Sequence, residues 1–244
     1  TTGEGAAGIY TYAGGAPKTG DTTTAIHADS ITTSGDYASG VMAIGASEGV
    51  HLNIDVDAVS TSGTGSRGVF GYGLGDIAVN AGTIATSGEG ASGVEAFSFY
   101  GDVKVGAANI STAGQAATGI YASTLTGDVV VETGDIATRG SFSSGVRAFS
   151  RTGDITVTGA GDIRTEGDYS YGVLAFGEGS IAIKNTGRVE TAGSFAHGLY
   201  ALGRGDGLTT VVNSGSVAVS GDYSSAIRAL GSYAGGGVKV VSTG

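Results

Sequence analysis

The chain repeats itself about every 26 residues, and this periodicity restricts its fold more than any other feature. Each repeat unit is a glycine followed by small or aromatic residues and, in most copies, by Gly-Val or Gly-Ile. The units begin near Gly3, Gly35, Gly63, Gly88, Gly114, Gly140, Gly167, Gly193 and Gly221. A period of this length indicates a solenoid, because one unit cannot bury its apolar face alone and must stack on its neighbours.

Each unit contains three short apolar runs separated by glycines. In the unit that begins at Gly140, the runs cover residues 145–148, 153–157 and 163–165. Apolar residues alternate with period two within each run, which is the period of a β-strand. Strands of about 3–5 residues are not stable as isolated hairpins, so they must stack on equivalent strands of neighbouring units. The sequence therefore predicts an all-β fold, a single-domain parallel β-helix over residues 1–244 with three short strands per coil and about nine coils.

We expect this solenoid to be right-handed, because crossovers between parallel strands prefer that hand. The sequence starts and stops at Thr-Gly steps that resemble the end of a repeat unit, so we interpret it as a fragment of a longer chain. Neither end carries a polar capping segment, and uncapped strand edges pair with other chains. We therefore expect the parent chain to continue or the rods to stack end to end.

Composition excludes several classes of protein. Glycine accounts for 48 of the 244 residues and proline for one, which excludes the collagen triple helix. The net charge of −10 argues against a nucleic-acid partner, which requires a basic surface. Cysteine is absent, so disulfides and thiolate metal sites are excluded. No apolar run approaches about 18 residues, so we expect no membrane insertion in this segment.

The most regular polar feature is an aspartate column at intervals of 26 residues, formed by Asp76, Asp102, Asp128 and Asp154. In register, these side chains would lie about 5 Å apart along the rod. Each aspartate follows a glycine at a turn, where aspartate tolerates unusual φ angles and forms hydrogen bonds with its own backbone. The alternative is a Ca²⁺ site, because closely spaced carboxylates repel one another unless a cation bridges them. We expect no other cofactor.

A second column is aromatic and is formed by Phe142, Tyr169, Phe195 and Tyr223, which occupy one position in four consecutive units. Tyr37 occupies the same position in an earlier unit. Rings stacked at a corner of the solenoid would stabilise it, by about 0.5–1.5 kcal/mol per pair. The alternative is an exposed strip that binds a ligand, either a glycan or a protein.

The repeats fit the patterns G-x-x-S-x-G-V-x-A, G-D-I-x-V and G-x-I-x-T, as at residues 140–148, 153–157 and 161–165. This pattern resembles the passenger β-helices of bacterial autotransporters and the filamentous-haemagglutinin-type adhesins. The resemblance implies an extracellular, cell-surface location and a non-catalytic structural or adhesive rod. It also implies a surface protein or glycan of a host or neighbouring cell as partner, or lateral or end-to-end self-association.

The β-helix fold also occurs in polysaccharide-acting enzymes of the pectin-lyase-like class, which is the alternative function. Of the motifs typical of such hydrolases, only His197-Gly198 is present, and it falls inside a regular repeat. The units vary little in length, so no long loop is predicted to build a catalytic cleft, and we expect no enzyme. Two other features are a stretched unit at residues 11–31, with a protruding loop at 14–20, and the adhesion tripeptide Arg204-Gly205-Asp206.

Overall fold

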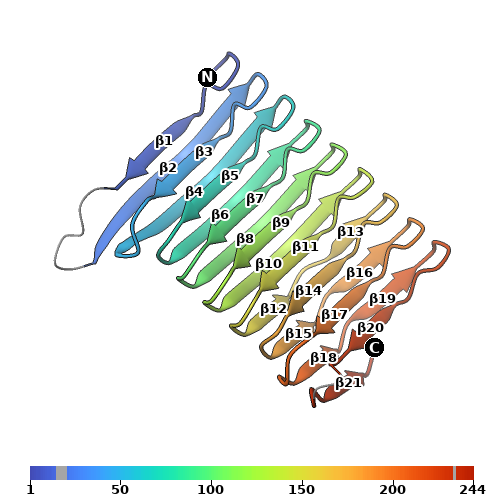
Figure 1. The fold of residues 1–244 in the computed structure, drawn as a ribbon. Helices are drawn as coiled ribbons and strands as arrows, with labels where there is room; N and C mark the ends of the chain where they lie inside the picture. Colours follow the sequence, from blue (N-terminus) through green and yellow to red (C-terminus); the bar gives the residue numbers. More distant parts are fainter. Residues whose placement is uncertain (15–20, 233–234) are drawn as a thin grey trace.

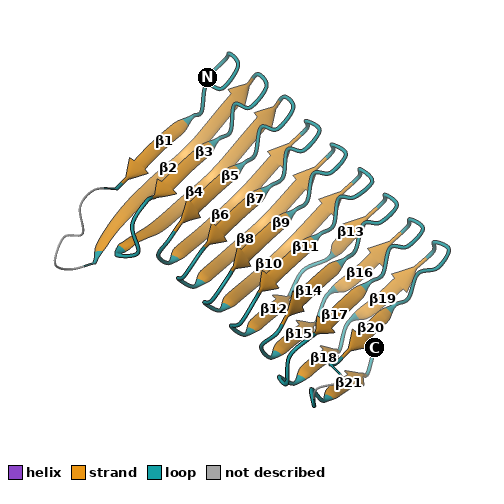
Figure 2. Ribbon diagram, viewed as in Figure 1, coloured by secondary structure: helices purple, strands orange, loops and turns teal. Residues whose placement is uncertain are grey.

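The computed structural model describes residues 1–14, 21–232 and 235–244, and all regular structure in these ranges is β-strand. The strands form a parallel β-solenoid in which each coil lies beside the preceding one, from the N-terminal to the C-terminal end (Figure 1). Figure 2 shows that short loops connect the strands and that no helix interrupts them in the part described. The all-β parallel solenoid predicted from the repeats is confirmed.

Two main sheets enclose the core. Sheet 1 contains nine strands: β1 (Ile9–Ala13), β3 (Val41–Gly45), β5 (Val69–Gly73), β7 (Val94–Ser98), β9 (Ile120–Thr124), β11 (Val146–Ser150), β14 (Val173–Gly177), β17 (Leu199–Gly203) and β20 (Ile227–Leu230). Sheet 2 contains twelve: β2 (Thr22–Ser34), β4 (Val50–Ser62), β6 (Ile77–Thr86), β8 (Val103–Thr112), β10 (Val129–Thr138), β12 (Ile155–Gly159), β13 (Ile163–Thr165), β15 (Ile181–Asn185), β16 (Arg188–Thr191), β18 (Thr209–Asn213), β19 (Ser216–Val219) and β21 (Val238–Ser242). The nine strands of sheet 1 define nine coils, so eight turns separate the first coil from the last.

The number of strands per coil differs from the expected three in the N-terminal half of the rod. There the second and third apolar runs form one continuous strand of 10 to 13 residues, as in β4 and β10. From Ile155 onward the two runs separate into distinct strands, such as β12 and β13. The reason is one added residue: Ile155 and Ile163 are eight positions apart, whereas Val129 and Ile136, with which they pair, are seven apart.

The core consists of columns of apolar side chains that run along the rod. The column from the first strand comprises Val41, Val69, Val94, Ile120, Val146, Val173 and Leu199, and all are buried. The columns from sheet 2 comprise Ile77, Val103, Val129, Ile155 and Ile181, and then Ile31, Val59, Ile84, Ile110, Ile136, Ile163 and Val189, which are also buried. These inner positions are those predicted from the alternating pattern. Burying each such side chain contributes about 1.5–3 kcal/mol.

A threonine column closes the turn that follows each of these inner strands. It comprises Thr33, Thr61, Thr86, Thr112, Thr138, Thr165 and Thr191, all buried. Each hydroxyl donates a hydrogen bond of 2.5 to 2.8 Å to the carbonyl oxygen five residues later. Because the bonded carbonyl lies in the turn, the same hydrogen bond fixes the turn geometry in these seven coils.

Glycine is required where one coil touches the next. At Gly68, an added Cβ would overlap Cγ2 of Ile84 and would lie 2.5 Å from the carbonyl oxygen of Gly93 in the following coil. Gly106 has no such neighbour, because the nearest atom, Oδ1 of Asn80, would lie 3.6 Å from an added Cβ. The glycine content therefore reflects close contact between coils at some positions and not at others.

We expect Gly68→Ala to lower the free energy of unfolding by about 1–3 kcal/mol, because the methyl group would force two packed coils apart. Gly106→Ala, the matched control within a strand, should change it by less than about 0.5 kcal/mol. Urea unfolding followed by circular dichroism measures both values. Equal effects of the two substitutions would show that contact between coils is not what requires glycine at this position.

Candidate functional site

The aspartate column forms a hydrogen-bonded ladder on the surface of the rod. The backbone N–H of Asp102 donates to Oδ1 of Asp76 at 2.8 Å, and Asp128 and Asp154 continue the series at the same distance. Oδ1 of Asp154 accepts the N–H of Ser180 at 2.7 Å. The column is structural, but its hydrogen bonds differ from the expected ones: each carboxylate accepts a backbone N–H of the next coil and not of its own turn.

Calcium binding by this column stays a prediction. All four carboxylates are exposed, and one oxygen of each is held by a backbone N–H. Among the residues that the structure describes, no three His, Asp or Glu side chains are grouped so that they could hold a metal ion.

The aromatic column is a ladder of stacked rings at the outer corner of a turn. The ring centroids of Phe142 and Tyr169 lie 5.1 Å apart, as do those of Tyr169 and Phe195, and the planes in both pairs differ by 2°. Tyr223 continues the ladder 4.9 Å beyond Phe195. The stack predicted from the sequence is present, and both flat faces of Tyr169 and Phe195 are occupied by neighbouring rings. A ligand could reach only the edges of these two rings.

The backbone at this column has a left-handed conformation that the sequence did not reveal. Phe142, Tyr169, Phe195 and Tyr223 have φ angles of 55° to 60°, and Ala116 at the same position has a φ of 53°. The earlier coils carry Gly65 and Gly90 here, also with positive φ. A bulky residue in this region is strained, so stacking between the rings offsets a backbone cost of about 1 kcal/mol or more per residue.

The outer face of sheet 1 carries the largest set of exposed apolar and aromatic side chains with a regular arrangement. Its first column comprises Tyr10, Met42, Phe70, Glu95, Tyr121, Arg147, Leu174, Tyr200 and Arg228. Its second column comprises Tyr12, Ile44, Tyr72, Phe97, Ser123, Phe149, Phe176, Leu202 and Leu230. We call these 18 positions the aromatic face. Apart from Ser123, they are half-buried or exposed.

The side chains of the aromatic face contact one another along the rod. The rings of Tyr72 and Phe97 stack with centroids 5.6 Å apart, and those of Phe149 and Phe176 with centroids 5.3 Å apart. Arginine guanidinium groups lie over the rings at several levels: Arg67 over Phe70, Arg147 over Tyr121, Arg204 over Phe176 and Arg228 over Tyr200, 4.6 to 5.9 Å from the centroids. These contacts hold the aromatic face in a fixed arrangement.

The charge of the aromatic face differs from that of the whole chain. Glu95 is its only carboxylate, and that side chain forms an ion pair with Arg67. With Arg147 and Arg228, the 18 positions sum to a charge of +1, in a chain whose net charge is −10. The acidic residues therefore lie elsewhere, and the aromatic face does not repel another apolar or acidic surface.

Sequence reasoning missed the aromatic face. The alternating pattern of the first apolar run predicts which valine and alanine side chains point inward, and it predicts no role for the positions between them. A signal was present, because Phe70, Tyr72, Phe97 and Phe149 all occupy those intermediate positions. A strand that is apolar on both sides indicates a sheet whose outer surface is also in contact with something.

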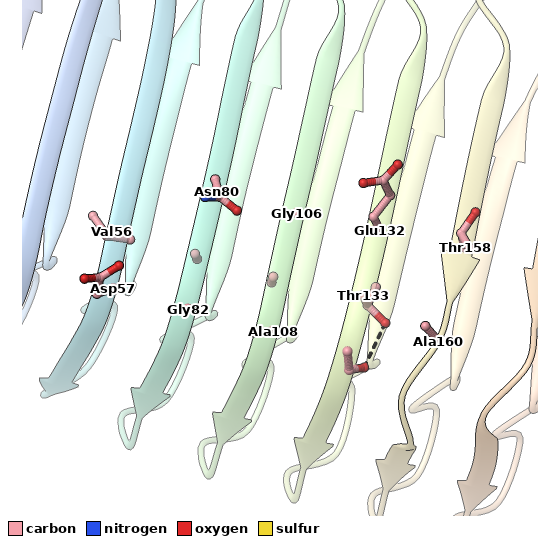
Figure 3. Close-up of a pocket in the computed structure, with 13 residues that line it drawn as sticks. Val56, Asp57, Asn80, Gly82, Gly106, Ala108, Glu132, Thr133, Thr158 and Ala160 are labelled. Atoms are coloured by element: carbon pink, nitrogen blue, oxygen red, sulfur yellow. Dashed lines mark hydrogen bonds between the residues drawn. The ribbon is translucent and has the colours of Figure 1, made fainter.

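Sheet 2 contains a shallow open groove of about 520 Å³ (Figure 3). Small residues form part of its lining, with Gly82, Ala108, Gly134 and Ala160 on successive coils. The two glycines are required by packing, because an added Cβ would overlap a backbone carbonyl of the preceding coil. The groove therefore follows from close contact between successive coils at these glycines. Its carboxylates, those of Asp57 and Glu132, are exposed to solvent.

His197, the residue of the His-Gly dipeptide, belongs to the packing of the last coils. The side chain is buried, and its Nδ1 accepts a hydrogen bond of 2.9 Å from the backbone N–H of Ser225. Its ring packs against Tyr171 and Tyr200, with centroids 5.7 and 5.2 Å away. Burial lowers the pKa of His197 below its ordinary value of 6.5, and the positive charge of Arg228 lowers it further. Burial is also the main cause that raises the pKa of Tyr171.

The two remaining features have different outcomes. The Arg204-Gly205-Asp206 tripeptide lies in the turn between β17 and β18, where the Arg204 guanidinium is 4.6 Å from the ring centroid of Phe176. Its role in adhesion stays a prediction. Of the loop expected to protrude at residues 14–20, residues 15–20 lie outside the described part of the chain.

Comparisons with known proteins return no relative of this chain. No protein-family model matches it, no curated protein sequence matches it, and no solved structure matches it. In the described ranges there is also no helix of the length and hydropathy needed to cross a membrane. The candidate site therefore rests on the geometry of the chain itself.

We expect Ala116→Tyr to raise the free energy of unfolding by about 0.5–1.5 kcal/mol, because the new ring would extend the ladder onto Phe142. The control is Gly90→Tyr, which has the same left-handed backbone but lies between Gly65 and Ala116 and gains no ring to stack on. It should be destabilising. Chemical unfolding of both variants measures the difference. A destabilising Ala116→Tyr would show that ring stacking does not offset the backbone strain.

We expect the rod to lose stability as the pH falls below 6.5, because the unfolded chain then protonates at His197 while the folded chain does not. The loss extends down to the lowered pKa of the folded state. His197→Gln keeps an acceptor for the Ser225 N–H and removes the titration, so its stability should depend less on pH in this window. Urea midpoints between pH 5 and 7.5 measure this. Parallel profiles for the two proteins would contradict it.

Proposed function

We propose that this chain is a non-catalytic structural and adhesive rod of a bacterial secreted or cell-surface protein, of the autotransporter-passenger or filamentous-haemagglutinin kind. The rod makes contact through the aromatic face. The observation that carries this proposal is the presence of two in-register columns of aromatic and aliphatic side chains on the outside of all nine strands of sheet 1.

The composition of the aromatic face supports a role in binding. Tyrosine, phenylalanine, methionine and arginine are enriched at protein interfaces, and tyrosine and arginine often contribute most of the binding energy. Eight steps of about 4.8 Å and strands of about five residues give an area near 600 Å². This area is at the upper end of the apolar patches found on monomeric proteins. A surface protein or glycan of a host or neighbouring cell, or another copy of the chain, would fit such a surface.

The polar groups of the rod support a non-catalytic role. The aspartate column accepts backbone N–H groups, and His197 accepts one as well. Each is thus committed to holding coils together. A general acid or base needs a position next to a bound substrate, and the exposed carboxylates of the open groove in sheet 2 have no enclosed cavity around them.

A binding and turnover assay tests the proposal. The purified rod is applied to immobilised polysaccharides and surface proteins, with and without Ca²⁺, and release of reducing ends or unsaturated products is measured in the same wells. We expect binding without product release. The double variant Phe97→Thr/Phe149→Thr, which keeps strand-forming residues, should bind at least about tenfold more weakly.

Lys104→Thr is the matched control, because Lys104 is exposed on sheet 2 in the same coil as Phe97. It should bind like the wild type. Product release in any well would overturn the non-catalytic assignment and favour a polysaccharide-acting enzyme. Binding that requires Ca²⁺ would indicate that the aspartate column takes part in binding. Equal binding by the double variant and the wild type would show that the aromatic face is not the binding surface.

A further inference from the structure

We propose that the occupant of the aromatic face is a second copy of this chain, packed face to face with its rod axis antiparallel. This inference rests on the proposed function, because it names the partner of the same surface. It follows from the order of charged and apolar residues along the two columns. When the columns of a second copy are laid against them in the reverse order, opposite charges meet in the central coils and mainly apolar or aromatic residues meet elsewhere.

The first column shows this complementarity in its charged residues. Tyr121 lies in the fifth of the nine coils, Glu95 in the fourth and Arg147 in the sixth. A two-fold axis that runs along the strand direction through the fifth coil places each coil k opposite coil 10 − k. Glu95 of one copy then faces Arg147 of the second copy, and the symmetry of an isologous interface forms this pair twice.

The other positions match in the same arrangement. In the first column Phe70 faces Leu174, Met42 faces Tyr200, and Tyr10 faces Arg228, which fits a cation–π contact. In the second column Phe97 faces Phe149, Tyr72 faces Phe176, Ile44 faces Leu202, and Tyr12 faces Leu230. Both charged positions of the central coils are thereby paired. The remaining contacts are apolar or aromatic, apart from the pair of Tyr10 with Arg228 and the contact of Ser123 with its own copy.

A parallel dimer lacks this match. A two-fold axis along the rod would place the first column of each coil opposite the second column of the same coil. Glu95 would then face Phe97 of the second copy, and Arg147 would face Phe149. Glu95 already pairs with Arg67 of its own chain, so Arg147 is the charge that would lack a carboxylate partner in this arrangement. Because desolvating such a charge is unfavourable, the charges favour the antiparallel arrangement while the rings supply the affinity.

The size and charge of the surface fit this partner. An area of about 600 Å² on each copy buries about 1,200 Å² in total, which is at the lower limit for a specific interface. Glu95 is the only carboxylate among the 18 positions, so the other acidic residues of this chain, whose net charge is −10, are kept away from the contact. We therefore expect a dimer of moderate affinity.

Charge variants in sedimentation equilibrium test the pairing. Arg147→Glu places Glu95 opposite a glutamate, and Glu95→Lys places Arg147 opposite a lysine. Each variant alone should dimerise about 100-fold more weakly or worse. An equimolar mixture of the two should recover the dimer, because both contacts of the mixed pair join opposite charges. Lys104→Glu, on sheet 2, is the control and should dimerise like the wild type.

A second measurement fixes the geometry and does not depend on those variants. The chain contains no cysteine, so single cysteines can be introduced without background. With a bismaleimide that spans about 10 Å, the distance between packed sheets, Tyr121→Cys should cross-link to itself. A mixture of Met42→Cys and Tyr200→Cys should form a cross-linked dimer. Either variant by itself should form none.

A monomer at all concentrations would overturn the dimer. So would a dimer that tolerates Arg147→Glu, or self-cross-linking of Met42→Cys alone, because these outcomes indicate another face or the parallel arrangement. The proposed function is tested separately. Product release from a polysaccharide would contradict the non-catalytic role. A monomer that binds glycans or proteins through the aromatic face would support the proposed function and contradict only the self-association.

Discussion

Every coil of this rod depends on the main-chain hydrogen bonds that it makes with the coils before and after it. The strands of sheet 1 contain four or five residues, and a strand of that length has no stability of its own. Parallel pairing in register places identical positions of successive coils a strand spacing apart. The columns of valine, threonine, aspartate and aromatic residues are all consequences of this spacing, since each side chain meets the equivalent side chain of its neighbour.

The sequence was sufficient to predict the architecture and the inner columns, because both depend on period alone. Val146, Ile155 and Ile163 each stand at the inward point of an alternating run, and all three are buried. The merging of two runs into one strand was not predictable from the runs themselves. It depends on whether seven or eight positions separate their leading residues, a difference of one residue in the turn after β12.

The candidate site was predicted less well, for a physical reason. The ring ladder at Tyr169 was visible as a column, but its positive φ was not, because a left-handed backbone at a bulky residue is contrary to normal preference. The aromatic face was missed because outward positions of a strand are normally polar, so Phe97 and Tyr72 were not interpreted as a surface. The two sets of rings differ in what they offer a partner. The ladder at the turn is a single row of stacked rings, whereas sheet 1 carries two columns of side chains that spread over nine strands and include both stacked rings and arginine contacts.

The side-chain hydrogen bonds between coils are not symmetric along the rod, because carboxylates and hydroxyls accept from opposite sides. Carboxylates in turns accept an N–H from the coil that follows them in the chain, as Asp128 does in the aspartate column and as Asp36 and Asp168 do in another turn. Hydroxyls such as that of Ser143 accept from the coil that precedes. The rod therefore has a direction. In each coil, the side that meets the preceding coil and the side that meets the following coil present different hydrogen-bonding groups. A finished coil already displays the acceptors that the next one needs, so it acts as a template for growth from the N-terminal side.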